Sequence, residues 1–320
     1  MTGQNRETVS ILIPAFNEER NLPRLLDAIR KDATLAPLLR EVLIDVSGST
    51  DRTGEIALQA RRGWEIVQVI DVGRRDGLMP ALDRLILAAT SDLLVRLDAD
   101  TQFEMGTLRS LVNHFADPTL GIIGPRIRAF SGRSILVNRL SDAEWAIHDR
   151  VSRLRPKTTV VQVFRRDGVR LLPDSPLEDV AIQEVVEQRG LSSGYAPEAE
   201  VWIMPPSTIR GYLTKRIRIV DQIRSHRARG YALPATAAPG VVVESALTTV
   251  RERGTSLSSM LLFFTSEAAA RAMSYLRSLI SRAPPFMWDP IDGTKEFDWP
   301  PTGVLPSIEG APKHHSVDRS

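Results

Sequence analysis

The 320-residue sequence contains no cysteine, which excludes disulfide bonds and thiolate metal ligands and agrees with a reducing cytoplasm. It lacks any apolar run of the ~18–20 residues that a membrane-spanning helix needs. The polar first eight residues show no signal peptide. Lysine is scarce, because only five of the 41 basic residues are lysine. We therefore expect a cytoplasmic protein without a transmembrane segment.

Charge of one sign is also lacking, since the net charge is only +2. This balance gives no whole-chain case for nucleic-acid binding. The hydrophobic content of 42% and the charged content of 25% are ordinary for a globular protein. A chain of this length can hold one large α/β domain and an appendage.

The most informative feature is the triplet Asp98-Ala99-Asp100, which follows an apolar strand predicted at 92–97. Two carboxylates separated by a small residue make a site of hard oxygen ligands that suits Mg²⁺ or Mn²⁺, especially when phosphate oxygens complete the shell. Open α/β sheets bind ligands outside the carboxyl ends of their strands. Taken alone, the triplet is equally typical of a solvated turn.

Strand and helix patterns alternate along the first half of the chain, which predicts a mostly parallel sheet. The predicted strands lie at 9–14, 41–46, 64–70, 92–97 and 120–127, and the predicted helices at 19–32, 51–62, 78–90 and 104–116. The second half adds strands at 159–165 and 195–204, and helices at 141–154, 178–189, 207–229 and 256–281. The segment 231–240 is read as a Pro- and Gly-bearing connection.

Two further motifs precede the acidic triplet. The first is Pro14-Ala15-Phe16-Asn17-Glu18 at the end of the first strand, and the second is Asp45-Val46-Ser47-Gly48-Ser49-Thr50-Asp51 at the end of the second. In this order and spacing, the three motifs resemble the inverting family 2 glycosyltransferases over about residues 8 to 220. The resemblance implies an α/β GT-A fold, in which a mixed, mostly parallel, Rossmann-like nucleotide-binding sheet is flanked by helices. A helical C-terminal appendage would follow.

The resemblance also implies a domain division. We expect a GT-A domain at 1–230, made of a nucleotide-sugar-binding half at 1–128 and an acceptor-binding half at 129–230. A helical appendage at 231–298 and a disordered tail at 299–320 would follow.

The family's site residues can be carried over position by position. Asp98 would lie near the ribose and the metal, and Asp100 would bind Mn²⁺ or Mg²⁺. Asp179 would be the catalytic base, with Glu178 as its alternate. The remaining donor-binding positions would be Pro14, Ala15, Asn17, Glu18, Asp45, Ser47, Arg75 and Gly77, with Arg216 and Arg218 near the diphosphate or an anionic acceptor. Without the resemblance, Glu178 and Asp179 read as ordinary first-turn charges of a helix, and the arginines as a solvated helix face.

Several positions depart from the family pattern. Ser47 stands where a second aspartate is usual, and Asp45 lies one residue early, which points its side chain to the opposite face of the strand. Leu78 replaces a lysine near the phosphates, so that Arg75 or Arg74 would supply the charge. The stretch 212–219 keeps an arginine but not the glutamine and tryptophan of processive relatives, which favours a single addition.

The expected function is therefore a metal-dependent, non-processive transfer of one sugar from a nucleotide-diphosphate sugar, UDP-sugar foremost, to an acceptor hydroxyl. The acceptor class stays open among glycans, lipid-linked compounds and small molecules. The alternative is a catalytically silent nucleotide-sugar-binding protein that acts as a partner or regulator.

The predicted helix 256–281 carries an apolar stripe. One interpretation is an interfacial helix that gives peripheral membrane contact. The other, which we favour from sequence, is packing on the catalytic domain or on a second copy in a homodimer. The stripe consists of Leu257, Met260, Leu261, Phe264, Ala268, Tyr275, Leu276, Leu279 and Ile280.

Overall fold

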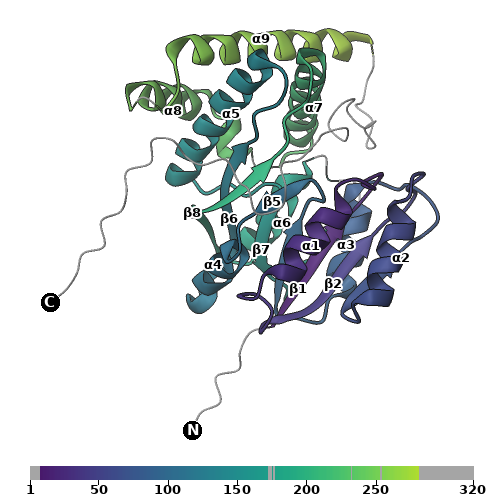
Figure 1. The fold of residues 1–320 in the computed structure, drawn as a ribbon. Coiled ribbons are helices and arrows are strands. Elements are labelled where there is room, and N and C mark those ends of the chain that lie inside the picture. The colour runs from purple at the N-terminus through teal and green to yellow at the C-terminus, as the bar shows by residue number, and fades with distance from the viewer. Residues whose placement is uncertain (1–7, 172–174, 176, 232, 253, 281–320) are drawn as a thin grey trace, which may run out of the picture.

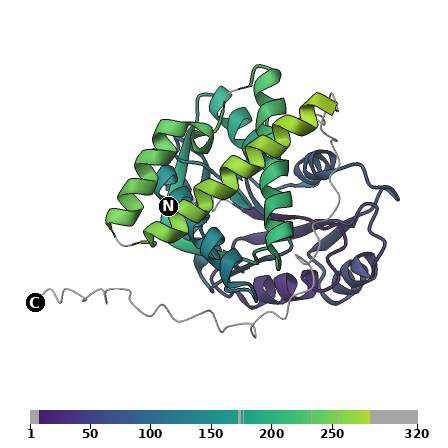
Figure 2. The same cartoon turned by 90° about the horizontal axis from the view of Figure 1, so that it is seen from above.

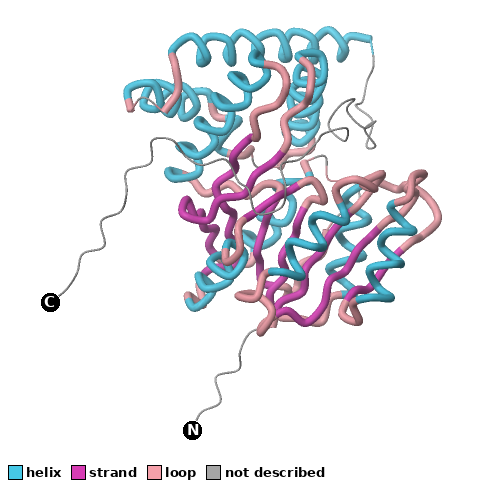
Figure 3. The backbone as a smooth tube through the Cα atoms, in the orientation of Figure 1, coloured by secondary structure: helices cyan, strands magenta, loops and turns pink. Residues whose placement is uncertain are grey.

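The computed structural model describes residues 8–171, 175, 177–231, 233–252 and 254–280. Within them, one eight-stranded sheet has the order β3-β2-β1-β4-β7-β6-β8-β5 (Figures 1 and 3). Its strands are β1 Val9–Pro14, β2 Leu39–Asp45, β3 Val67–Ile70, β4 Leu93–Leu97, β5 Thr101–Phe103, β6 Leu120–Ala129, β7 Val161–Arg165 and β8 Ser192–Ile203.

The first four strands of this order run parallel, because β1 pairs with β2 and β4, and β2 pairs with β3, all in the same direction. β7 enters antiparallel between β4 and β6, and β5 is antiparallel to β8. The sheet is thus mixed and mostly parallel, as the sequence predicts.

Alternate residues of each strand point to opposite faces of the sheet. Because apolar residues lie on both faces, helices cover both of them. On β1, Ile11 and Ile13 pack in one core with α1, α2 and α4, and Leu12 packs in the other with α3 and α6. These helices are α1 Leu22–Lys31, α2 Thr53–Gly63, α3 Leu78–Ala88, α4 Thr107–Asn113 with the 3₁₀ turn η1 His114–Ala116, and α6 Glu178–Gln188.

A separate helical layer lies over one end of the sheet (Figures 1 and 2). It consists of α5 Ile135–Leu154, α7 Ile209–Ala228, the 3₁₀ turn η2 Ala235–Ala237, α8 Pro239–Arg251 and α9 Leu257–Ile280. Its own core joins Val137 and Ile147 of α5 to Tyr212 of α7, Ala246 of α8 and Phe263 of α9. The helical C-terminal region expected from the sequence is confirmed.

Two helices differ from the sequence prediction. α5 begins at Ile135 rather than 141, because the Ser134 hydroxyl accepts a hydrogen bond from the Val137 N–H at 3.4 Å and caps the added turn. α8 forms in a stretch whose beginning was read as a connection, with Pro239 at a first-turn position that tolerates proline. The division at 230 stays a prediction, and 281–320, with the predicted tail 299–320, lies outside the described residues.

α9 packs inward with only part of its apolar stripe, since Met260 and Phe264 join the core of the helical layer. Leu257, Leu261, Leu276 and Leu279 are 61%, 60%, 52% and 67% exposed, whereas Met260 and Phe263 face inward. The inward polar side chains are satisfied inside the layer, because Ser259 accepts from Arg139 and Ser274 donates to Asp221. The expectation that the stripe packs on the protein therefore holds for Met260 and Phe264, which pack against α5 and α7, and not for the four exposed leucines. Contact of the exposed part with a second copy stays a prediction.

None of the helices in the described ranges is long and apolar enough to cross a membrane.

Candidate active site

The three sequence motifs meet at one edge of the sheet. β1, β2 and β4 are parallel neighbours, and Pro14 at the end of β1 is paired in register with Asp45 at the end of β2. The triplet Asp98-Ala99-Asp100 directly follows β4. The carboxyl ends of the strands thus bring the predicted donor-binding positions Pro14, Ala15 and Ser47 to the same edge as the two carboxylates.

The loops after β1 and β2 brace each other. Asn17 has a φ of 55°, a left-handed conformation that asparagine tolerates, and its side-chain oxygen accepts from the Thr50 N–H at 2.8 Å. The next N–H, of Glu18, donates to the Thr53 hydroxyl at 2.7 Å. Asn17 and Glu18, which the sequence marked as substrate-binding, therefore hold the two loops together, and direct contact with a ligand stays a prediction.

Arg75 is presented at this edge by two glycines. Gly77 has a φ of 104°, which lets the chain turn into α3. Gly48 has a φ of 74°, and a Cβ there would lie 2.2 Å from the Arg75 amide nitrogen. The Arg75 guanidinium lies 4.2 Å from the ring centroid of Phe16, in the first motif. A cation is thus held beside the first motif, and its replacement of the family's lysine near the phosphates stays a prediction.

Arg84 of α3 organises the end of β2. It pairs with the Asp45 carboxylate at 2.8 Å and with Asp76 at 2.6 Å, and donates to the Ser47 hydroxyl at 3.2 Å. The Asp45 side chain is only 1% exposed. Asp45, which the sequence placed among the donor-binding positions, therefore supports the loop from inside, and a direct contact with a donor stays a prediction. The two carboxylates raise the pKa of Arg84 despite its partial burial, so this cation stays charged.

We expect Arg84→Met to lower the free energy of unfolding by about 3 kcal/mol, because it leaves a buried carboxylate unpaired. Urea unfolding at pH 7 measures the change. The double variant Arg84→Met/Asp45→Asn should recover part of the loss, since the unpaired charge is then gone. A double variant as unstable as the sum of the two single variants would contradict the pairing.

A chain of buried polar groups runs from the acidic triplet into the molecule. The fully buried Arg96 donates to Asp98 Oδ1 at 3.0 Å and to Gln162 Oε1 at 3.2 Å. Gln162 donates to the Thr158 hydroxyl at 2.7 Å, and that hydroxyl is 3.2 Å from Gln183 Oε1 on α6. The sequence analysis missed Arg96 and Gln162, whose only signal is a polar residue inside an otherwise apolar strand.

The residues at this edge fit a hard divalent cation. The Asp98 side chain is 26% exposed and Asp100 is half-buried, so carboxylate oxygens are within reach of solvent. Across the described part of the chain, no group of three or more His, Cys, Asp or Glu side chains could hold a metal alone. An ion here would depend on oxygen atoms from a bound ligand, which is how magnesium commonly binds with phosphates.

The predicted base lies at the start of α6. Glu178 is the first residue of this helix, and Asp179 is the second. Their side chains lie outside the described residues, so their catalytic role stays a prediction. The helix itself is held from two sides, by the Gln183 contact with Thr158 and by Glu184, whose carboxylate is 2.8 Å from His226 Nε2 of α7.

The two arginines of α7 differ in environment. Arg216 pairs with Glu144 of α5 at 2.7 Å and with Glu267 of α9 at 2.5 Å, and its side chain is 13% exposed. It therefore joins α5, α7 and α9 through two ion pairs, and its contact with a diphosphate or an anionic acceptor stays a prediction. Arg218 is half-buried, with no hydrogen-bond partner for its Nε in the described structure. Its substrate role stays a prediction.

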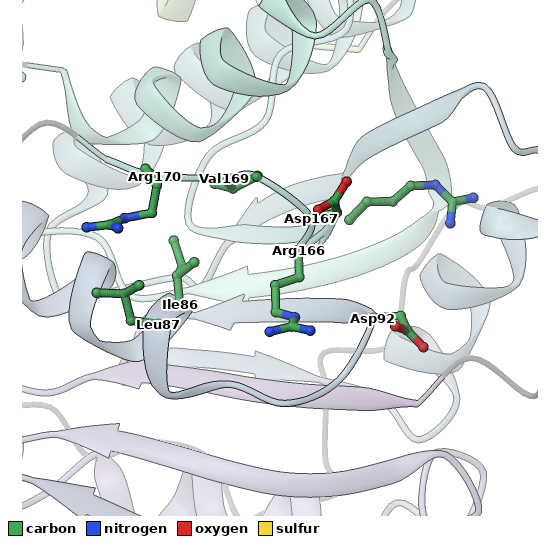
Figure 4. Close-up of a pocket in the computed structure, with 9 residues that line it drawn as sticks. Ile86, Leu87, Asp92, Arg166, Asp167, Val169 and Arg170 are labelled. Carbon is green, nitrogen blue, oxygen red and sulfur yellow. The ribbon is translucent and has the colours of Figure 1, made fainter.

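A hollow of about 630 Å³ lies at the beginning of β4, at the end of the strand away from the three motifs (Figure 4). Two of its arginines have partners within the protein, because Arg166 donates to the Ala89 carbonyl at 3.1 Å and Arg170 pairs with Asp83 at 3.2 Å. Asp92, just before β4, also lines it. This hollow is separated from the motif edge by the length of the strand.

Comparison with known proteins bears on the same half of the chain. Residues 10–171 match the family model described as "Glycosyl transferase family 2". A pre-mycofactocin glycosyltransferase of Mycobacterium tuberculosis is 27% identical over 126 residues, or 39% of this chain and 25% of that protein. A dolichol-phosphate mannosyltransferase of Pyrococcus furiosus is 32% identical over 118 residues, or 37% of this chain and 33% of that protein. The chain thus spans a quarter to a third of the length of these relatives.

Solved structures share the fold. A mannosyltransferase of Pyrobaculum calidifontis, in complex with GDP-Man and Mn²⁺, aligns with a TM-score of 0.58 at 20% identity and covers 88% of this chain and 83% of that one. The glucosyl-3-phosphoglycerate synthase of Mycobacterium tuberculosis, in complex with Mg²⁺ and UDP, aligns with a TM-score of 0.50 at 20% identity, over 71% of this chain and 80% of that one.

Proposed function

Because the chain belongs to glycosyl transferase family 2, we propose that it transfers a single sugar, with inversion, from a nucleotide-diphosphate sugar to an acceptor hydroxyl. UDP-sugar is the foremost donor candidate. The observation that carries the proposal is the placement of Asp98 and Asp100 at the edge where the ends of β1 and β2 also meet. The structures with bound GDP-Man or UDP and a divalent ion support the same assignment.

The chemistry requires charge compensation and proton removal. Asp98 and Asp100 would hold Mn²⁺ or Mg²⁺, which as a Lewis acid would stabilise the negative charge on the departing diphosphate. Arg75 adds positive charge at the same edge. The acceptor hydroxyl has a pKa far above 7, so a positioned carboxylate at the start of α6, Asp179 or otherwise Glu178, accepts its proton during attack.

A second candidate is a silent nucleotide-sugar-binding protein with a partner or regulatory role. It is favoured by the Arg84 contacts that bind Asp45 and Ser47 inside the loop, and by Leu78 in the place of a cation. This candidate predicts donor binding without turnover.

Donor stabilisation and donor hydrolysis separate the two candidates. We would screen UDP-, GDP- and dTDP-sugars with Mn²⁺ by thermal shift, since a bound donor raises the melting temperature by mass action. Release of nucleoside diphosphate without acceptor would then be measured for each stabilising donor. Stabilisation together with hydrolysis supports the enzyme, and stabilisation alone supports the silent protein. A result with no stabilisation and no hydrolysis contradicts both candidates.

We also propose peripheral contact between the outer face of α9 and an anionic lipid surface. The outer face consists of Leu257, Leu261, Tyr275, Leu276 and Leu279, all of them exposed. The exposed charges of α9 are Arg271 and Arg277, 58% and 52% exposed, which lie 3.4 Å from Glu267 and 4.0 Å from Asp221, two carboxylates that are themselves buried. An apolar face with only positive charge beside it suits anionic lipid.

We expect the protein to co-sediment with phosphatidylglycerol vesicles, and Leu261→Ser/Leu276→Ser to abolish this, because two apolar side chains leave the outer face. The matched control is Leu58→Ser/Leu87→Ser, which changes two leucines 46% and 55% exposed on α2 and α3. If the outer-face variant instead converts a dimer to a monomer and vesicles bind neither protein, the face is a homodimer contact.

A further inference from the structure

A cavity of about 440 Å³ lies between the helical layer and the sheet. This volume is within the range of ~300–1,000 Å³ that is common for small-molecule sites. Its walls are mostly apolar and come from every long helix of the layer: Trp145 from α5, Ile219 and Ile223 from α7, Val242 from α8, and Phe263 and Phe264 from α9.

The cavity borders residues that adjoin both motifs of the proposed reaction. Val160 lines it, and the Val160 carbonyl accepts a hydrogen bond from the Asp98 N–H at 3.2 Å. Leu177 and Val180 line it as well, and these two residues flank Glu178 and Asp179 at the start of α6. A molecule in the cavity would therefore contact Val160, Leu177 and Val180, which adjoin the acidic triplet and the start of α6.

The charged side chains of the lining are unequal in sign. Among the lining side chains that the structure describes, the cations are Lys157, Lys215, Arg216 and Arg271, and the carboxylates are Glu144 and Glu267. Lys215 Nζ lies 3.8 Å from Glu144 and 5.5 Å from the ring centroid of Trp145. Burial raises the pKa of Glu144, but Lys215 and Arg216 outweigh this and keep the carboxylate ionised. The positive charge that is in excess among these described side chains favours an anionic group on a ligand.

His148 adds one polar atom to the apolar wall. It is 7% exposed, and its Nε2 has no hydrogen-bond partner within the described ranges. Burial, with the nearby charges of Lys157 and Lys215, holds the pKa of His148 well below its usual range, so the ring is neutral at pH 7. A buried polar atom without a partner is costly, and a ligand hydroxyl would satisfy it.

Given the proposed sugar transfer, on which this inference rests, we infer that the cavity binds an amphipathic acceptor. The apolar body of the acceptor fills the space between α7, α8 and α9. Its anionic group pairs with Lys215, and its accepting hydroxyl faces the edge formed by Asp98 and the start of α6. A small, fully polar acceptor would leave these apolar walls uncovered.

Calorimetric titration of the full chain with three soluble probes tests the inference. We expect geranyl phosphate to bind most tightly, geraniol less tightly, and glycerol 3-phosphate least. Val242→Trp should weaken geranyl phosphate binding by about tenfold or more, the effect typical of a filled apolar subsite. Leu247→Trp is the matched control on the same helix, since Leu247 is 66% exposed and does not line the cavity.

The role of the ligand's negative charge and the source of the acceptor, solution or bilayer, are tested by separate variants. Lys215→Gln should weaken geranyl phosphate about threefold to tenfold, as expected for a partly exposed ion pair, and leave geraniol unchanged. The Leu261→Ser/Leu276→Ser variant should bind dissolved geranyl phosphate normally, and a loss of transfer only to acceptors embedded in vesicles would identify the bilayer as the source. Val243→Trp, at a more exposed lining position, replaces Val242→Trp if the latter unfolds.

Two results overturn the inference. One is geranyl phosphate binding no tighter than glycerol 3-phosphate. The other is an unchanged affinity for geranyl phosphate in the folded cavity variant, which is Val242→Trp or, if that unfolds, Val243→Trp. The failure of the proposed function looks different, because geranyl phosphate would then bind in the cavity while no nucleotide sugar is hydrolysed or stabilises the protein.

Discussion

Asp100→Asn is expected to reduce sugar transfer by about 10²–10³-fold, the range found when one stabiliser of developing charge is removed. Asparagine keeps the size of the side chain but removes the negative charge that a divalent ion requires. The fold should be unaffected, since Asp100 lies in the turn after β4 and not in the core. Initial rates with saturating donor, at several Mn²⁺ concentrations, measure the effect.

Asp92→Asn is the matched control for this prediction. It makes the same exchange at an exposed position just before the same strand, at the far end from the motif edge. The control should retain full activity and the same Mn²⁺ dependence. Unchanged activity of Asp100→Asn in the presence of a chelator would exclude Asp100 as a metal ligand.

Asp179→Asn is expected to reduce transfer by about 10²–10⁴-fold, as for the loss of a positioned general base. Donor affinity should change little, because Gln183 and Glu184, which are unchanged in this variant, anchor α6. Single-turnover transfer and donor-dependent thermal shift, measured on the same preparation, separate the two effects.

Glu178→Gln is the neighbouring control, since it removes one carboxylate from the same helical turn. It should keep most of the activity if Asp179 is the base. If Glu178→Gln is the inactive variant and Asp179→Asn is active, the roles are exchanged. Loss of donor affinity in Asp179→Asn would instead place this residue among the donor contacts.

Most of the fold follows from local sequence patterns. The Val- and Leu-rich runs that end at Pro14, Asp45 and Leu97 form neighbouring parallel strands, so the motifs at their ends meet where the sequence predicts. α8 was not predicted because Pro239 and Gly240 read as a break, although proline is compatible with the first turn of a helix.

The orientation of side chains is what the sequence could not supply. Arg84 lies inside an apolar segment, and its partner Asp45 is distant in the chain. Arg96 also lies inside an apolar segment, and its hydrogen bond to Asp98 is apparent only in the folded structure. Arg216 resembled a phosphate contact until its two glutamate partners on α5 and α9 were known. Likewise, an apolar stripe on α9 does not reveal which face packs inward.

The buried polar chain from Asp98 through Arg96, Gln162 and Thr158 to Gln183 has an evolutionary consequence. Each link satisfies the next, so a change at one position leaves a buried polar atom without its partner. Among descendants of this sequence, these positions should therefore change together or not at all. The apolar side chains that line the cavity carry no such hydrogen-bond constraint, so those positions can change one at a time while the polar network is retained.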